Sequence, residues 1–278
     1  MNKQKESHYL SLIRAIALLL IVTKHTIEIP KDAPYFSALL RNLLDYFSSF
    51  GVFIYFVLGG YLFYYNIDTI KTYLLKKSRT LMIPWIFCGI VLYGYFTIRH
   101  GVLAVNLFQY IMGIGNHLWY MTSFFIIIMS FKLLTKIRYG ELILVLCGIA
   151  LLFPDCFSFC TQGNYFYQWY FAGAWPIAVV IGYLINKYEL QTRLYLITRK
   201  YGMLLSIPIL LACIAVTFLN IGMQYWSGIY LICSLLSIPF IIWMSLLLDK
   251  VLGSTMIEIA RYSLVSRFIC GTFQWQVH

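Results

Sequence analysis

The chain of 278 residues is 61% hydrophobic and only 11% charged, and its formal net charge is +11. Soluble globular domains carry about 25% charged residues, so this composition excludes a soluble globular protein and indicates one embedded in a membrane. In a membrane protein a positive excess is expected in the loops on one side of the bilayer, and it therefore does not indicate a nucleic-acid partner.

Apolar segments recur along the chain and predict an all-α, polytopic transmembrane helix bundle with eight to ten spans. The first segment is expected to be a retained span, because no small-residue cleavage site follows it. We interpret residues 1–278 as a single membrane-embedded domain that is expected to be incomplete at its C-terminus, where residues 251–278 are only weakly apolar. The eight expected spans are residues 10–29, 47–65, 80–98, 117–134, 142–153, 169–185, 203–221 and 228–248.

The segments between the spans carry the charge. Loops are expected over residues 31–45 and 154–168, basic connectors over 66–79 and 186–202, and a re-entrant or interfacial piece over 101–116. With the loops placed alternately on the two sides, fourteen lysines and arginines fall on the side of the N-terminus and three on the other, Lys31, Arg41 and Arg99. This bias predicts a cytoplasmic N-terminus.

Two ionisable side chains lie within the first span. Each costs roughly 2.5–3.5 kcal/mol at the centre of a spanning helix on insertion scales, so such residues mark function by default. Arg14 and His25 are eleven residues apart, which in a helix puts them about 16 Å apart along the axis and on nearly the same face. That face would hold a cation near the cytoplasm and a titratable imidazole in the outer half, which suits an anionic donor and proton transfer.

Four segments in this order resemble the acyltransferase-3 family of integral membrane acyltransferases, which O-acetylate bacterial surface sugars. They are RAIALLLIVTKH from Arg14 to His25, GVFIYFVLGGYLF over residues 51–63, KKSRTLMIPW over 76–85 and HLWYM over 117–121. The resemblance covers about the first 135 residues. Gly59 stands where the family usually has Ser, and the tail lacks the family's usual closing pattern.

The resemblance implies a multi-pass acyltransferase of the inner (plasma) membrane. It implies acetyl-CoA as the donor, taken from the cytoplasm, and a hydroxyl of a cell-surface glycan or its lipid-linked precursor as the acceptor. Membrane lipid is then a further expected partner and nucleic acid is not. No CxxC or histidine-rich pattern predicts a metal site.

Three residues are the catalytic candidates. Histidine has a pKa near ambient pH, so His25 suits the base that takes the proton of the sugar hydroxyl. Arg14 is a fixed planar cation that suits the phosphates or the pantetheine carbonyl of the donor, with snorkelling to the headgroups as the alternative. Asp45, and less so Glu28, would orient and charge-stabilise the imidazole, unless it is an ordinary loop carboxylate.

The expected donor-binding residues lie at the cytoplasmic side and in the second span. Lys76, Lys77 and Arg79 would hold the polyanionic donor, although topology-setting charge explains them equally well. Gly59 and Gly60 would let a ligand pass close to the backbone, with helix packing as the alternative.

His117 and Trp119 are the candidates for binding the acceptor, with the indole stacking on a sugar. An interfacial tryptophan is the simpler explanation for the second residue. An exporter or solute transporter would use Arg14 and His25 as substrate and proton sites instead, but it should show paired repeats with broken helices. A truncated, inactive relative is a third possibility.

Overall fold

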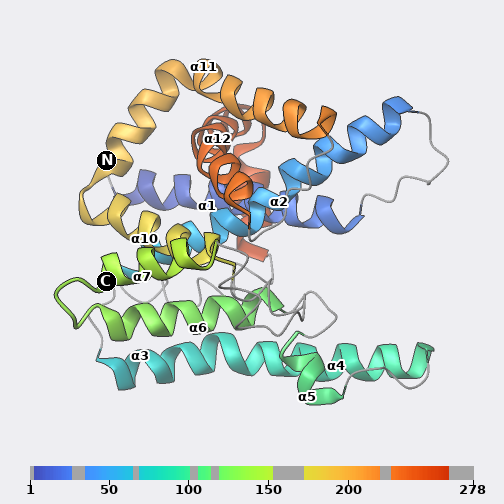
Figure 1. Ribbon diagram of the computed structural model, residues 1–278, viewed down its shortest axis with the longest axis vertical. Helices are drawn as coiled ribbons and strands as arrows, with labels where there is room; N and C mark the ends of the chain where they lie inside the picture. The colour runs from blue at the N-terminus through green and yellow to red at the C-terminus, as the bar shows by residue number, and fades with distance from the viewer. Residues whose placement is uncertain are drawn as a thin grey trace.

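The computed structural model describes residues 3–26, 35–64, 69–100, 106–113, 119–152, 172–219 and 227–262. All regular structure in these ranges is helical (Figure 1), which confirms the all-α prediction. Four helices are long and apolar enough to cross a membrane, and four shorter apolar helices accompany them, so the span count of eight to ten stays a prediction. The four long segments are Asn42–Phe63, Ile70–Arg99, Leu190–Phe218 and Gly228–Leu252.

Helix α2 (Tyr35–Phe63) is the central helix, and α1 (Lys3–Thr26) lies against it. Small residues let the backbones approach: a Cβ on Gly51 would come within 2.6 Å of the Ala17 carbonyl oxygen of α1. Close approach at small residues is the usual packing device of membrane helices, where burial of apolar surface supplies no driving force. The loop predicted over 31–45 is wrong from Tyr35 onward, because α2 begins there.

Helices α3 (Ile70–Lys77), η1 (Ser78–Met82) and α4 (Ile83–His100) form one continuous rod at the edge of the bundle (Figure 1). The Thr69 side chain caps its start by accepting from the Thr72 N–H at 3.3 Å. The π-helical turn ends one residue before Ile83 and Pro84 begin the next helix, and Pro84 has no N–H to donate to a carbonyl one turn back. The connector predicted over 66–79 is therefore helical from Ile70.

The next helices pack on this rod and on α2. The short α5 (Leu107–Ile111) turns back against α4, with the rings of Tyr93 and Tyr110 at 5.5 Å. It lies within the predicted re-entrant or interfacial piece. Helix α6 (Trp119–Leu134) runs beside the rod, and α7 (Gly140–Ala150) and α10 (Ala174–Lys187) follow (Figure 1). The predicted loop 154–168 lies outside the described residues.

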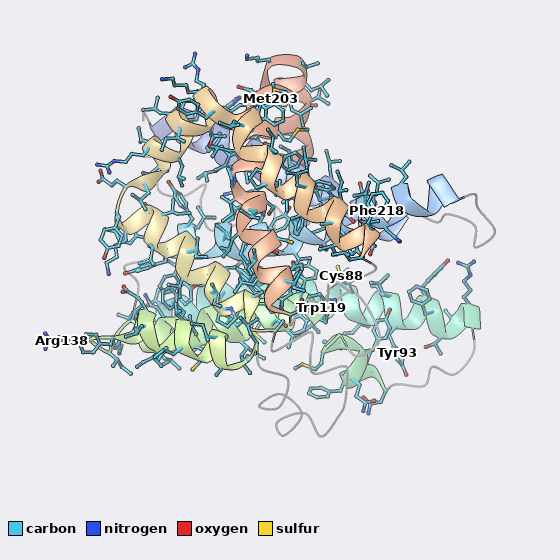
Figure 2. The ribbon with its side chains drawn as sticks, turned by 45° about the horizontal axis from the view of Figure 1, so that its top comes forward. Cys88, Tyr93, Trp119, Arg138, Met203 and Phe218 are labelled. Carbon is cyan, nitrogen blue, oxygen red and sulfur yellow. The ribbon has the colours of Figure 1, made fainter. Side chains whose placement is uncertain are left out.

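Helices α11 (Leu190–Phe218) and α12 (Gly228–Tyr262) complete the bundle. Each is kinked, at Tyr201 and at Leu252. The connector predicted over 186–202 is wrong from Leu190 onward, because those residues form the first arm of α11. Large apolar side chains such as Met203 and Phe218 project outward from the second arm (Figure 2), as expected of a surface that faces lipid.

Candidate functional site

Arg14 lies in the middle of α1, between the buried residues Ile13 and Ala15. Its backbone carbonyl accepts a hydrogen bond from the Tyr55 hydroxyl of α2 at 3.2 Å. The side chain is half-buried, and among the described residues its Nε atom is buried without a hydrogen-bond partner. A buried donor without a partner costs about 1–3 kcal/mol, and more when it is charged. The guanidinium therefore keeps an unused donor inside the bundle, as a residue that binds an anionic or carbonyl-bearing ligand would.

His25 lies in the last turn of the same helix, because α1 runs unbroken from Lys3 to Thr26. The helical spacing assumed for Arg14 and His25 therefore applies, and the two Cα positions lie about 16 Å apart along the axis on nearly one face. The placement of the His25 side chain lies outside what the structure describes.

Asp45 lies in α2, and its side chain is half-buried. The contacts of Arg14 with Tyr55 and of Ala17 with Gly51 show that α1 and α2 run antiparallel. Continued along both helices, this register puts Asp45 at about the depth of His25. The arrangement is compatible with the predicted Asp–His pair, although α1 and α2 diverge toward this end (Figure 1).

The residues of the predicted basic cluster differ in their exposure. Lys76 and Arg79 are exposed, whereas the Lys77 ammonium lies 5.5 Å from the centre of the Tyr73 ring. Lys132 of α6 lies over the same ring at 5.2 Å and over the Phe63 ring at 5.4 Å. The ammonium groups of Lys77 and Lys132 thus both lie near the Tyr73 ring. Together they give this end of the bundle a positive potential that would attract phosphate groups.

Gly59 and Gly60 lie where α2 meets other helices. A Cβ on Gly59 would overlap the Phe124 ring of α6, and one on Gly60 would overlap the Val179 backbone of α10. The packing alternative accounts for both glycines, because their free side is filled by protein. Their predicted role in donor binding is not needed to explain them.

Trp119 is buried at the start of α6, with its ring 5.9 Å from that of Trp175. The Trp175 ring in turn stacks on Phe56 at 4.9 Å and meets Tyr230 edge-on at 5.8 Å. Trp119 therefore belongs to an aromatic core shared by several helices. His117 lies outside the described residues, so the predicted acceptor pair cannot be assembled from the two side chains.

These groups lie at three depths along α2. Phe63, which lies beneath the Lys132 ammonium, is at the basic end. Tyr55, which donates to the Arg14 carbonyl, lies eight residues before it. Asp45, at about the depth of His25, lies ten residues before Tyr55. At 1.5 Å per residue the two intervals are about 12 and 15 Å. The described residues contain no group of three or more side chains suited to hold a metal ion.

Two residues of the candidate site, Lys132 and Tyr55, were not predicted from the sequence. Lys132 was assigned only to the end of a span, and its contact with Tyr73 joins residues far apart in the chain through the packing of α6 on the rod. Tyr55 was one tyrosine among 23. Tyr55 lies within the segment 51–63 that resembles the family, but nothing in that segment distinguishes it from the other aromatic residues. For Lys132 the signal was its basic charge near the cytoplasmic boundary.

Comparison with known proteins gives one match. The sequence model of a family described as an acyltransferase domain matches residues 7–265, nearly the whole chain. The matched range includes Arg14, His25, Asp45 and Lys132. No curated protein and no solved structure gives a significant match.

Proposed function

The chain belongs to the acyltransferase-3 family of membrane acyltransferases, and from that premise we propose that it moves an acetyl group from acetyl-CoA to a hydroxyl of a cell-surface glycan or its lipid-linked precursor. It resides in the inner (plasma) membrane with its N-terminus in the cytoplasm. The observation that carries the proposal is the buried Arg14 Nε atom, which has no partner among the described residues and lies on the helix that also holds His25.

The donor enters from the basic end of the bundle. Lys77 and Lys132, gathered on Tyr73, attract the phosphates of CoA. The long flexible arm of CoA then extends past Arg14, whose guanidinium donates to a carbonyl or phosphate oxygen. At 1.5 Å per residue, Arg14 lies about 12 Å from the basic end and about 15 Å from the depth of His25, so it lies on the path between the two.

The chemistry takes place at the depth of His25. The acceptor hydroxyl attacks the thioester carbonyl while the imidazole takes the hydroxyl proton, and CoA leaves as its thiolate, which is then protonated. Asp45 acts as a positioning residue that stabilises the imidazolium. General-base catalysis of this kind contributes about 10²–10⁴-fold.

The test uses the purified full chain in phospholipid nanodiscs with radiolabelled acetyl-CoA and a lipid-linked glycan acceptor. We expect His25→Gln to lower label transfer by about 100-fold or more. The matched control is His8→Gln on the same helix, because His8 pairs with Asp249 at 2.7 Å and has no part in the proposed chemistry. His8→Gln should retain most of the activity.

A second arm tests donor binding. Lys132→Gln should raise KM for acetyl-CoA about tenfold or more with little change in kcat, because it removes one hydrogen bond to a charged group, which contributes roughly 1.5–3 kcal/mol. Equal activity of the His25 and His8 variants would overturn the catalytic assignment. Absence of acetyl turnover together with solute flux across vesicles would favour the transporter.

A further inference from the structure

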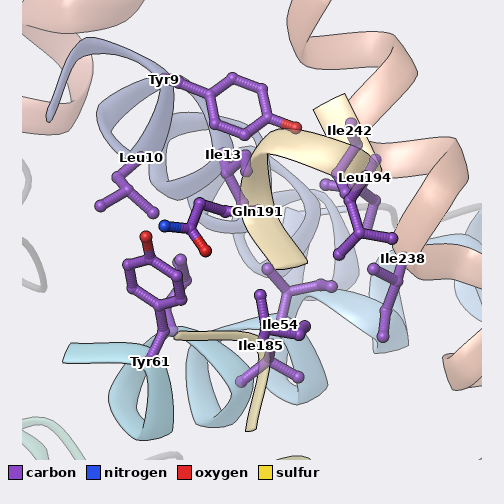
Figure 3. A pocket seen from close by; sticks show the side chains of 13 residues that line it. Tyr9, Leu10, Ile13, Ile54, Tyr61, Ile185, Gln191, Leu194, Ile238 and Ile242 are labelled. Atoms are coloured by element: carbon purple, nitrogen blue, oxygen red, sulfur yellow. The ribbon is translucent and has the colours of Figure 1, made fainter. Parts of the chain in front are cut away.

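An apolar pocket lies between α1, α2, α11 and α12, with the end of α10 at its rim (Figure 3). Its floor is buried and includes Ile13, Ile54, Leu58 and Ile241. Its rim is partly exposed, so the pocket is open on that side. The empty space is about 580 Å³, a figure that includes the open solvent at the mouth.

The lining is almost entirely carbon, and its polar side-chain atoms belong to Tyr9, Tyr61 and Gln191. Gln191 extends into the pocket between the rings of Tyr9 and Tyr61 (Figure 3). Its Oε1 atom is buried and has no hydrogen-bond partner in the part of the chain that the structure describes. A buried acceptor of this kind is expected to find a donor on whatever fills the pocket.

The composition of the walls excludes most classes of ligand. Water in a cavity needs two to four polar partners, and apolar cavities stay dry. A sugar or a nucleotide would leave several hydroxyls or amides unpaired against aliphatic side chains, which is unfavourable for each group. A hydrocarbon chain loses nothing by contact with these walls, and the bilayer around the long helices supplies such chains.

We propose that this pocket binds one hydrocarbon chain of a membrane lipid, with a hydroxyl or amide N–H of that lipid donating to Gln191 Oε1. The chain enters past the partly exposed rim residues Leu10, Leu194 and Ile238 and ends on the buried floor. The proposal goes beyond acyl transfer and does not rest on it, because it follows from the pocket alone. A phospholipid and a polyprenyl-linked acceptor share this chemistry.

The experiment is photolabelling of the full chain in detergent micelles, without added phospholipid, with a C16 fatty acid that carries a diazirine at its end. Labelled positions are found by mass spectrometry, and the label on pocket residues is divided by that on the exposed Met203. Leu194→Trp fills the rim of the pocket. The matched control, Leu196→Trp, adds the same ring two residues away on the same helix, at a side chain that is 56% exposed.

We expect Leu194→Trp to lower the pocket-to-surface ratio by about tenfold or more, which corresponds to 1.4 kcal/mol of lost binding, and Leu196→Trp to leave it within about twofold. Equal ratios in both variants would overturn the proposal. Where Leu194→Trp fails to elute as a folded species, Ile238→Phe replaces it with the same expected loss.

Competition identifies the source of the chain. Displacement by unlabelled polyprenyl phosphate assigns the pocket to the lipid-linked acceptor, and displacement by unlabelled phospholipid assigns it to a structural lipid; either supports the proposal. Failure of both to displace the label at saturation would refute it. Because the readout is labelling, loss of acetyl transfer leaves this test intact.

Discussion

Replacement of Arg14 by Met separates a ligand-binding role from a structural one. In the structure the Nε atom is buried and, within the described ranges, unpartnered, so the ligand-free protein bears a penalty of about 1–3 kcal/mol. Methionine has a similar length and no polar group, so it removes the unpaired buried donor together with its penalty. We therefore expect Arg14→Met to raise the midpoint of thermal unfolding by about 2–4 °C per kcal/mol relieved.

The same substitution should lower activity. A hydrogen bond to a charged group contributes about 1.5–3 kcal/mol, so kcat/KM for acetyl-CoA should fall roughly 10- to 150-fold. Arg14→Lys keeps the charge but loses the planar arrangement of donors. Its kcat/KM should therefore lie between the values of the unmodified protein and of Arg14→Met. Thermal unfolding is followed by tryptophan fluorescence, and activity by release of the CoA thiol.

Lys71→Met is the matched control, because Lys71 is an exposed cation of α3 outside the proposed site. It should change stability by less than about 0.5 kcal/mol and leave kcat/KM unaltered. The reasoning is refuted if Arg14→Met lowers the unfolding midpoint and preserves kcat/KM. That result would mean that Arg14 snorkels to the headgroups and packs, as the alternative interpretation holds.

Two further predictions concern stability. Gly60→Ala should lower stability by about 1–3 kcal/mol, because its Cβ would overlap the Val179 backbone, whereas Gly94→Ala, with open space around it, should gain up to about 1 kcal/mol; equal midpoints in thermal unfolding would contradict the packing role. Glu141→Gln should lower stability by only about 0.5 kcal/mol, because the ion pair with Lys187 at 2.6 Å is one-third exposed. If this loss of stability does not become smaller at high salt, the contribution of the pair to stability is not electrostatic.

The positions of the helices followed from hydropathy, but their ends did not. Hydropathy detects the apolar middle of a helix that must lie in lipid, and it says little about a polar extension of the same helix. The segment Tyr35–Asp45 was predicted to be a loop because it carries the charged residues Arg41 and Asp45, yet four of its residues are leucine and it continues α2. The basic residues of α3 and of the first arm of α11 were taken for connectors for the same reason, although Lys, Arg and Leu are good helix formers.

The candidate site, too, could be predicted from the sequence only in part. Arg14 was identified from the sequence because a charge inside an apolar span is costly in any helical arrangement, so the signal does not depend on the fold. Its bond from Tyr55, and the shared ring beneath Lys77 and Lys132, depend on which helices pack together, and that is set by small residues such as Gly51 and Gly60. A glycine in the sequence indicates that another helix approaches closely at that position, but it does not indicate which helix. The buried charge of Arg14 could therefore be identified from the sequence, whereas the groups around it could be identified only from the structure.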